Sequence, residues 1–189
     1  KEVSIKMRVI LLGPPGTGKG TFAQLLSDEF KVEKIVAGDL LREEVNKNSK
    51  IGRKVEELIK EGHIVPAEII AKLINSNIKG KKDFIIDGFP RTLEQLELFK
   101  DKIDKVIFIN SSYRVAVKRL GNRVICRNCG RVYHLINNPP KIKGRCDVCG
   151  GELYVREDET EEGIRKRLEL YKKETLPVIE YYRKKGLLV

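Results

Sequence analysis

The feature that most constrains the fold is the stretch GPPGTGKGT at residues 13–21, which directly follows the apolar run Val9-Ile10-Leu11-Leu12. The pattern GxxxxGK between a buried strand and a helix is typical of loops that surround polyphosphate with backbone N–H groups and a helix N-terminus. The lysine of such a loop reaches the β and γ phosphates. The sequence therefore predicts a nucleoside triphosphate site at Gly16, Thr17, Gly18, Lys19, Gly20 and Thr21.

Residue 20 departs from the usual loop, because Gly20 stands where Ser or Thr commonly holds magnesium, and Thr21 comes one residue too late. A carboxylate is available at Asp87, the last residue of the run Phe84–Asp87. An acidic residue at a strand end resembles the magnesium-linked aspartate of many phosphate-loop proteins, although it can also cap the following turn. We expect Mg²⁺ to be held mainly by phosphate oxygens and water, with Asp87 orienting that water.

Short apolar runs alternate with helical periodicity along most of the chain. The predicted strands are Arg8–Leu12, Lys34–Val36, Phe84–Asp87 and Val106–Ile109. Helical spacing appears at residues 22–30, at 51–59 with Gly62 as a stop, at 66–74 opened by Pro66, and at 164–171 capped by Asp158 or Thr160. Strands that alternate with helices predict an α/β fold with a parallel sheet.

The segment from about Gly121 to Glu157 breaks this alternation, since it is rich in turn residues and poor in core residues. It carries all four cysteines in two CxxC pairs, Cys126 with Cys129 and Cys146 with Cys149. This spacing is typical of a zinc ribbon, in which four thiolates complete a tetrahedral site and leave no position open for chemistry. Iron at the same site and two redox CxxC motifs are the alternatives. We interpret the neighbouring His134 as a hydrogen-bonding residue.

Two arginines follow predicted strands in a similar layout. Arg91 lies in the stretch GFPRTLEQ after Asp87, and Arg42 ends the stretch AGDLLR after the strand at residues 34–36. Side chains at the carboxyl ends of neighbouring parallel strands face the crevice in which such folds bind ligands. Arginine makes bidentate contacts to phosphate, so the pair indicates a second phosphate site. A nucleotide kinase needs such a site, whereas a simple ATPase does not.

The motifs GPPGTGKGT, GDLLR and FIIDGFPRTLEQ, followed by RVYH, NPPK and RKRL, occur in the order and spacing of the nucleoside monophosphate kinases. From about Arg8 to Tyr182 the chain resembles an adenylate kinase with a long lid. The resemblance implies an α/β fold in which a P-loop parallel-sheet core is flanked by helices. The implied core comprises residues 1–35, 66–120 and 160–189, the helical NMP-binding insertion residues 36–65, and the small zinc-bearing β-rich lid residues 121–159. It also implies transfer of the ATP γ-phosphoryl group to AMP with Mg²⁺, giving two ADP.

The resemblance further implies roles for single residues. Lys19, Asp87 and the arginines Arg42, Arg91, Arg123, Arg156 and Arg167 are the implied catalytic residues. Beyond the loop, ATP contacts are implied for Arg119, Arg123, Val132 and Tyr133. AMP contacts are implied for Ala37, Arg42, His63, Ile64, Val65, Gly88, Phe89, Pro90, Arg91, Gln95, Arg156 and Arg167. Gln95 would read adenine, although Thr92-x-x-Gln95 is also a helix capping box.

Ala37 departs from the family pattern, because members that use AMP usually carry Ser or Thr there. The stretch AGDLLR resembles kinases that prefer UMP or CMP, whereas Thr92, Gln95 and the long lid resemble the adenylate enzymes. We expect AMP as the acceptor, with UMP or CMP as the alternative.

The formal net charge of +11 implies anionic partners. An ATP-dependent nucleic-acid-binding zinc-ribbon protein is therefore a remote alternative, but the basic runs lack interleaved aromatics and no RRM, KH or helix-turn-helix signature occurs. We expect ATP and AMP as partners, no nucleic acid, no membrane and a monomer. Clustered cysteines without a signal-like N-terminus indicate a reducing compartment, so the expected location is cytoplasmic.

Overall fold

The computed structural model describes residues 7–60, 63–156 and 159–189. Its main sheet is parallel, with the order β2-β3-β1-β4. The strands are β1 (Arg8–Leu12), β2 (Lys34–Val36), β3 (Phe84–Asp87) and β4 (Lys105–Phe108). The last residues of the chain lie beside β4, since Val106 N–H donates to Leu187 O and Val189 N–H donates to Val106 O, both at 2.9 Å. The predicted parallel α/β sheet is confirmed.

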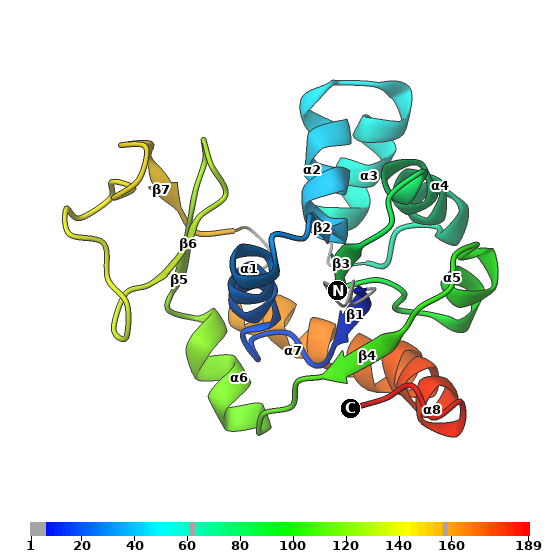
Figure 1. Ribbon diagram of the computed structural model, residues 1–189. Helices are drawn as coiled ribbons and strands as arrows, with labels where there is room; N and C mark the ends of the chain where they lie inside the picture. Colours follow the sequence, from blue (N-terminus) through cyan, green and yellow to red (C-terminus); the bar gives the residue numbers. More distant parts are fainter. Residues whose placement is uncertain (1–6, 61–62, 157–158) are drawn as a thin grey trace, which may run out of the picture.

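Helices cover both faces of this sheet because alternate residues of β1 point to opposite sides. Ile10 and Leu12 pack into the larger core, which includes residues of α4 and α8, whereas Val9 and Leu11 pack against Ala23 of α1. Figure 1 shows these helices wrapped around the strands. The helices of this part are α1 (Lys19–Phe30), α4 (Ala67–Ile78), α5 (Leu93–Leu98), α6 (Tyr113–Leu120), α7 (Glu161–Leu170) and α8 (Leu176–Lys184).

Two smaller units project from the sheet and its helices (Figure 1). One is the helix pair α2 (Ala37–Asn46) and α3 (Lys50–Lys60). The other is a three-stranded antiparallel sheet in the order β6-β5-β7, formed by β5 (Arg123–Cys126), β6 (Val132–His134) and β7 (Leu153–Tyr154). Its small core consists of Val124, Cys126, Tyr133, Cys146 and the partly buried Leu153. The second unit is therefore β-rich and poor in apolar contacts, as the sequence predicted.

Two local predictions were wrong by one position. Strand β4 begins and ends one residue earlier than predicted, although Ile109 N–H still donates to Leu12 O at 2.9 Å. Pro66 is the N-cap of α4 rather than its first residue. Thr160 caps α7 by accepting from Gly163 N–H at 3.1 Å, as predicted. Gly62 and Asp158 lie outside the described residues.

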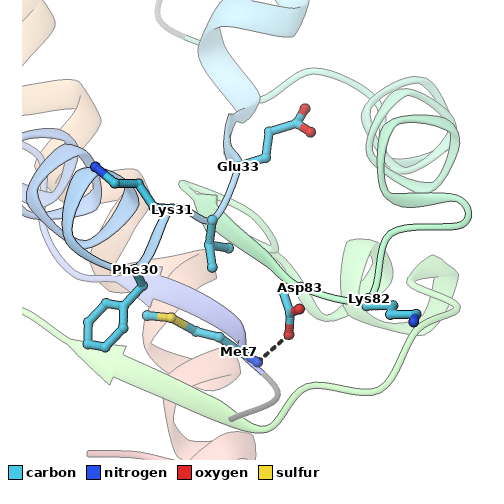
Figure 2. A pocket seen from close by; sticks show the side chains of 7 residues that line it. Met7, Phe30, Lys31, Glu33, Lys82 and Asp83 are labelled. Atoms are coloured by element: carbon cyan, nitrogen blue, oxygen red, sulfur yellow. Dashed lines mark hydrogen bonds between the residues drawn. The ribbon is translucent and has the colours of Figure 1, made fainter. Parts of the chain in front are cut away.

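The apolar spacing of α1 does not mark its buried face. Phe22, Leu25 and Phe30 are exposed, and α1 buries Ala23 instead. Phe22 and Leu25 line the main cleft described below, while Phe30 lines a second hollow at the amino-terminal ends of the strands. Figure 2 shows this hollow, where Met7 N–H donates to Asp83 Oδ1 at 2.7 Å. None of the predicted site residues lines it.

No helix within the described ranges is both long and apolar enough to cross a membrane.

The α2–α3 pair packs so closely that Gly52 has no room for a side chain. A Cβ atom on Gly52 would lie 2.2 Å from Glu44 O of the neighbouring helix. We expect Gly52→Ala to lower the free energy of unfolding by about 1–3 kcal/mol because the backbones must separate. Urea denaturation measures the change. Gly121→Ala is the matched control, since its Cβ would meet Val117 O at an ordinary 3.5 Å with a φ of −66°. Equal stability of the two variants would contradict the close approach.

Candidate active site

A cleft of about 740 Å³ opens at the carboxyl ends of β1 and β3, between the sheet, the α2–α3 pair and the small antiparallel sheet. The parallel register pairs Leu11 with Asp87, so the end of β3 lies beside the loop that follows β1. All of the predicted nucleotide-site residues line this cleft except Phe89 and Pro90. The structure therefore brings the residues of the two predicted phosphate sites into one cavity.

The loop between β1 and α1 is stabilised by its own lysine, whose side chain donates to carbonyl oxygens of the loop. Lys19 Nζ donates to Gly13 O at 2.9 Å and to Pro14 O at 2.7 Å. Arg119 Nη1, from α6, donates to Thr17 O at 3.0 Å. Burial lowers the pKa of Lys19 to about 8, with the negative charge of Asp87 opposing this fall. The lysine is therefore an enclosed cation beside the position where the loop would receive phosphate.

Asp87 is the carboxylate available to a metal near this loop. It is buried at the end of β3, and burial raises its pKa while the charge of Lys19 opposes the rise. A Cβ atom on Gly20 would lie 3.3 Å from Asp87 Oδ2, so a serine or threonine side chain there would crowd the carboxylate. An oxygen ligand at Asp87 without a hydroxyl at residue 20 fits Mg²⁺ carried largely by phosphate oxygens and water.

Arg91 is fixed by its own loop on the other side of the cleft. Its Nε donates to Gly88 O at 2.8 Å, and its backbone N–H donates to Gln95 Oε1 at 2.8 Å. Thr92 Oγ1 accepts from Gln95 N–H at 3.1 Å, so Thr92 caps α5 as predicted. The reciprocal half of the capping box is different, because Gln95 Oε1 accepts from Arg91 and not from Thr92. Gln95 lines the cleft, and its role in reading adenine stays a prediction.

A buried carboxylate that the sequence analysis did not single out joins two of the cleft arginines. Glu159, whose side chain is fully buried, pairs with Arg123 of β5 and lies 3.7 Å from Arg167 Nη1 of α7. Arg156 lines the same cleft. Glu159 therefore compensates positive charge between the small antiparallel sheet and α7. The sequence shows Glu159 only as an acidic residue three positions after Arg156. Its pairing with Arg123 joins two distant segments and becomes visible only in the fold.

Of the remaining predicted residues, some line the cleft, whereas Phe89 and Pro90 do not. Arg42 pairs with Asp39 one turn earlier on α2, and Ala37 is buried at the start of that helix; both line the cleft. His63 also lines it, with Nε2 3.3 Å from Lys166 Nζ. By contrast, Phe89 points into the main core, where its ring packs edge-on against Phe99 with the centroids 5.8 Å apart. Pro90 is buried after a cis peptide bond.

The four cysteines converge at one end of the small antiparallel sheet. Their Sγ atoms all lie within 4.8 Å of one another, with 3.4 Å between Cys126 and Cys149 and 3.6 Å between Cys129 and Cys146. Tetrahedral zinc with four thiolates requires sulfur separations of roughly 3.8 Å.

Each CxxC turn closes through a glycine, since Gly130 N–H donates to Cys126 O and Gly150 N–H donates to Cys146 O. These glycines have φ values of 70° and 69°, which favour glycine. The cluster fits one structural Zn²⁺.

Tyr133 lies between the cleft and this cluster. Its ring is buried, its hydroxyl lies 3.4 Å from Cys146 Sγ, and it accepts from Asp147 N–H at 2.8 Å. The tyrosine hydroxyl lowers the pKa of the Cys146 thiol to about 6, which favours the thiolate that a metal requires. The nearby His134 accepts from Ile136 N–H and Asn137 N–H through Nδ1, which confirms its predicted hydrogen-bonding role.

A parallel sheet with a phosphate loop, a facing set of arginines and a projecting small sheet fits a phosphate-loop nucleoside monophosphate kinase, because it offers one cleft to two phosphate compounds. The family model for adenylate kinase matches residues 11–187. The chain is 45% identical to an adenylate kinase of Thermosipho melanesiensis over 96% of this chain and 90% of that protein. It is 46% identical to adenylate kinases of Caldicellulosiruptor bescii (97% and 90% covered) and Archaeoglobus fulgidus (96% and 88%). The chain belongs to the adenylate kinase family.

The hydrogen bond from Tyr133 to Cys146 predicts an effect on metal retention. We expect Tyr133→Phe to weaken zinc binding about tenfold, because a ligand that loses its outer hydrogen bond is held less firmly. Competition with a chromophoric chelator measures the affinity. Tyr154→Phe is the control, since that ring stacks under Arg127 with 4.4 Å from the guanidinium carbon to its centroid. Unchanged zinc affinity in Tyr133→Phe would contradict the assignment.

Proposed function

We propose that this chain catalyses ATP + AMP = 2 ADP with its phosphate loop holding the donor and its arginines holding the acceptor and the group in transfer. The observation that carries the proposal is the convergence of Lys19, Arg42 and Arg91 on one cleft of about 740 Å³. Membership of the adenylate kinase family supports the reaction and does not favour the UMP or CMP alternative.

The donor side depends on the loop and on Lys19. Backbone N–H groups at the start of α1 face the position where the β and γ phosphates would lie. Lys19 exchanges its two carbonyl partners, Gly13 O and Pro14 O, for phosphate oxygens. Asp87, at the end of β3, would hold Mg²⁺ through water, and the ion would supply charge that offsets the phosphate oxygens.

The acceptor side depends on Arg42 and Arg91, which reach the cleft from α2 and from the loop after β3. Guanidinium groups bind the AMP phosphate in bidentate geometry and hold its oxygen in line with the γ-phosphorus. Arg123, Arg156 and Arg167 then surround the group in transfer with positive charge. Phosphoryl transfer requires little covalent help, so positioning and charge supply most of the catalysis.

The proposed domains correspond to these separate roles in binding and closure. The core comprises residues 1–35, 66–120 and 160–189, the AMP-binding insertion residues 36–65, and the lid residues 121–159. The lid carries Arg123 on β5 and Arg156, so its closure over ATP would bring positive charge in and keep water out. Four free, clustered cysteines support a reducing location such as the cytoplasm. We expect a monomer that acts on free nucleotides without nucleic acid or membrane.

Arg91→Ala tests the acceptor role directly. We expect kcat/KM for AMP to fall on the order of 10²–10³-fold because a charged phosphate contact is lost. Initial rates of ADP formation, with two ADP counted per ATP consumed, measure the effect. Arg114→Ala is the control, since that exposed side chain on α6 does not line the cleft. Wild-type turnover of AMP by Arg91→Ala would refute the role.

The lowered pKa of Lys19 predicts pH-dependent ATP binding. In the free enzyme Lys19 loses its proton as the pH rises through about 8, whereas bound phosphate raises its pKa. Binding of ATP is therefore strongest below about pH 8 and weakens above it, with proton uptake on binding. Calorimetry from about pH 7.5 to about pH 9.5 measures both quantities.

Lys19→Arg is the matched variant for this titration, because arginine stays charged throughout the range. Its ATP affinity should change little across the same pH interval. A flat profile in the unmodified enzyme, or an equally steep one in Lys19→Arg, would assign the pH dependence elsewhere.

A further inference from the structure

Helices α7 and α8 run on from one another through a single widened turn, η2 (Tyr171–Thr175). In this turn Leu176 N–H donates to Tyr171 O, five residues back, as in a π-helix. Pro177 follows one residue later and has no N–H to donate. In a regular α-helix its ring would also clash with the carbonyl of Lys173, four residues back. The wider turn accommodates this proline without ending the helix.

The widened turn places Thr175 against the loop that carries Arg91. Thr175 is 6% exposed, and its Oγ1 donates to Arg91 O at 3.0 Å across a sequence separation of 84 residues. The backbone N–H of Arg91 in turn donates to Gln95 Oε1 at 2.8 Å. Arg91, which lines the cleft, is therefore held by a buried side chain at its carbonyl and by another at its N–H.

The same continuous helix also carries Arg167, which lines the cleft one element earlier on α7. Thr175 also lines that cleft. The continuous helix therefore carries Arg167 into the cleft, and through Thr175 it also supports the loop that carries Arg91.

We propose that Thr175 is a positioning residue for the acceptor phosphate, acting through the Arg91 backbone to hold the guanidinium where AMP binds. The proposal rests on the proposed function, in which Arg91 binds the AMP phosphate. The hydroxyl carries this role, because the methyl group of threonine can pack but cannot hold a carbonyl oxygen. Threonine and valine side chains have nearly the same shape, so a valine at residue 175 separates the hydrogen bond of the hydroxyl from the packing of the side chain.

Thr175→Val removes the hydroxyl and keeps the shape. We expect KM for AMP to rise about tenfold, as for loss of one buried hydrogen bond that orders a binding group. KM for ATP should stay within about twofold and kcat should change little, because the contact acts on binding in the ground and transition states alike. Thr175→Ser restores the hydroxyl and should return KM for AMP close to that of the unmodified enzyme.

Val178→Ala is the control for a purely structural effect, since Val178 is fully buried in the core on α8 and does not line the cleft. It should lower the melting temperature and leave KM for AMP unchanged. If Thr175→Val does not fold, the comparison of Thr175→Ala with Thr175→Ser provides the same test.

Three results would overturn the proposal. Thr175→Val could lose stability with KM for AMP unchanged, Thr175→Ser could match Thr175→Val, or KM for ATP could rise as much as KM for AMP. Failure of the proposed function is distinguishable from all three, because the unmodified enzyme would then show no AMP-dependent formation of ADP.

Discussion

The structure depends on positive charge gathered at the carboxyl edge of one parallel sheet. Lys19 lies enclosed after β1, and Arg42, Arg91, Arg123, Arg156 and Arg167 line the same cleft. The register that pairs Leu11 with Asp87 brings one carboxylate to this edge, and Asp39 and Glu159 pair with arginines nearby. Like charges repel across a low-dielectric cavity. In the proposed reaction the phosphates of ATP and AMP supply the opposing charge. Substrate binding therefore offsets the repulsion between the cations and favours the arrangement that brings them together.

The arrangement also accounts for the units that project from the sheet. The cations come from the loop after β1, from α2, from the loop after β3, from the small antiparallel sheet and from α7. The core of the small sheet has few apolar side chains, and two of the four cysteines that fit zinc, Cys126 and Cys146, form part of it. A structural metal stabilises a unit of this size when packing alone is insufficient. Tyr133 connects this cluster to the cleft, because it lines the cleft and its hydroxyl contacts Cys146 of the cluster.

Much of this could be predicted from the sequence because the signals are local. The strand before GPPGTGKGT, the CxxC pairs and the Thr160 cap each depend on residues a few positions apart. The contacts that were not predicted join distant segments, such as Glu159 with Arg123 and Thr175 with Arg91. The exposed faces of Phe22 and Leu25 were also not predicted, because apolar spacing does not distinguish a core from a ligand cleft. Pro177 within a helical pattern was the one local sign of the widened turn.

The central claim is that this cleft takes AMP as the acceptor of the ATP γ-phosphoryl group. The most direct test measures initial rates with Mg²⁺ and ATP against AMP, UMP, CMP and GMP separately, following each diphosphate product. Rapid formation of ADP with AMP, and little turnover of the other three, is the predicted result. Faster turnover of UMP or CMP would contradict the assignment and show that Ala37, buried at the start of α2, belongs to a pyrimidine site. Turnover of none of the four would contradict the kinase account itself.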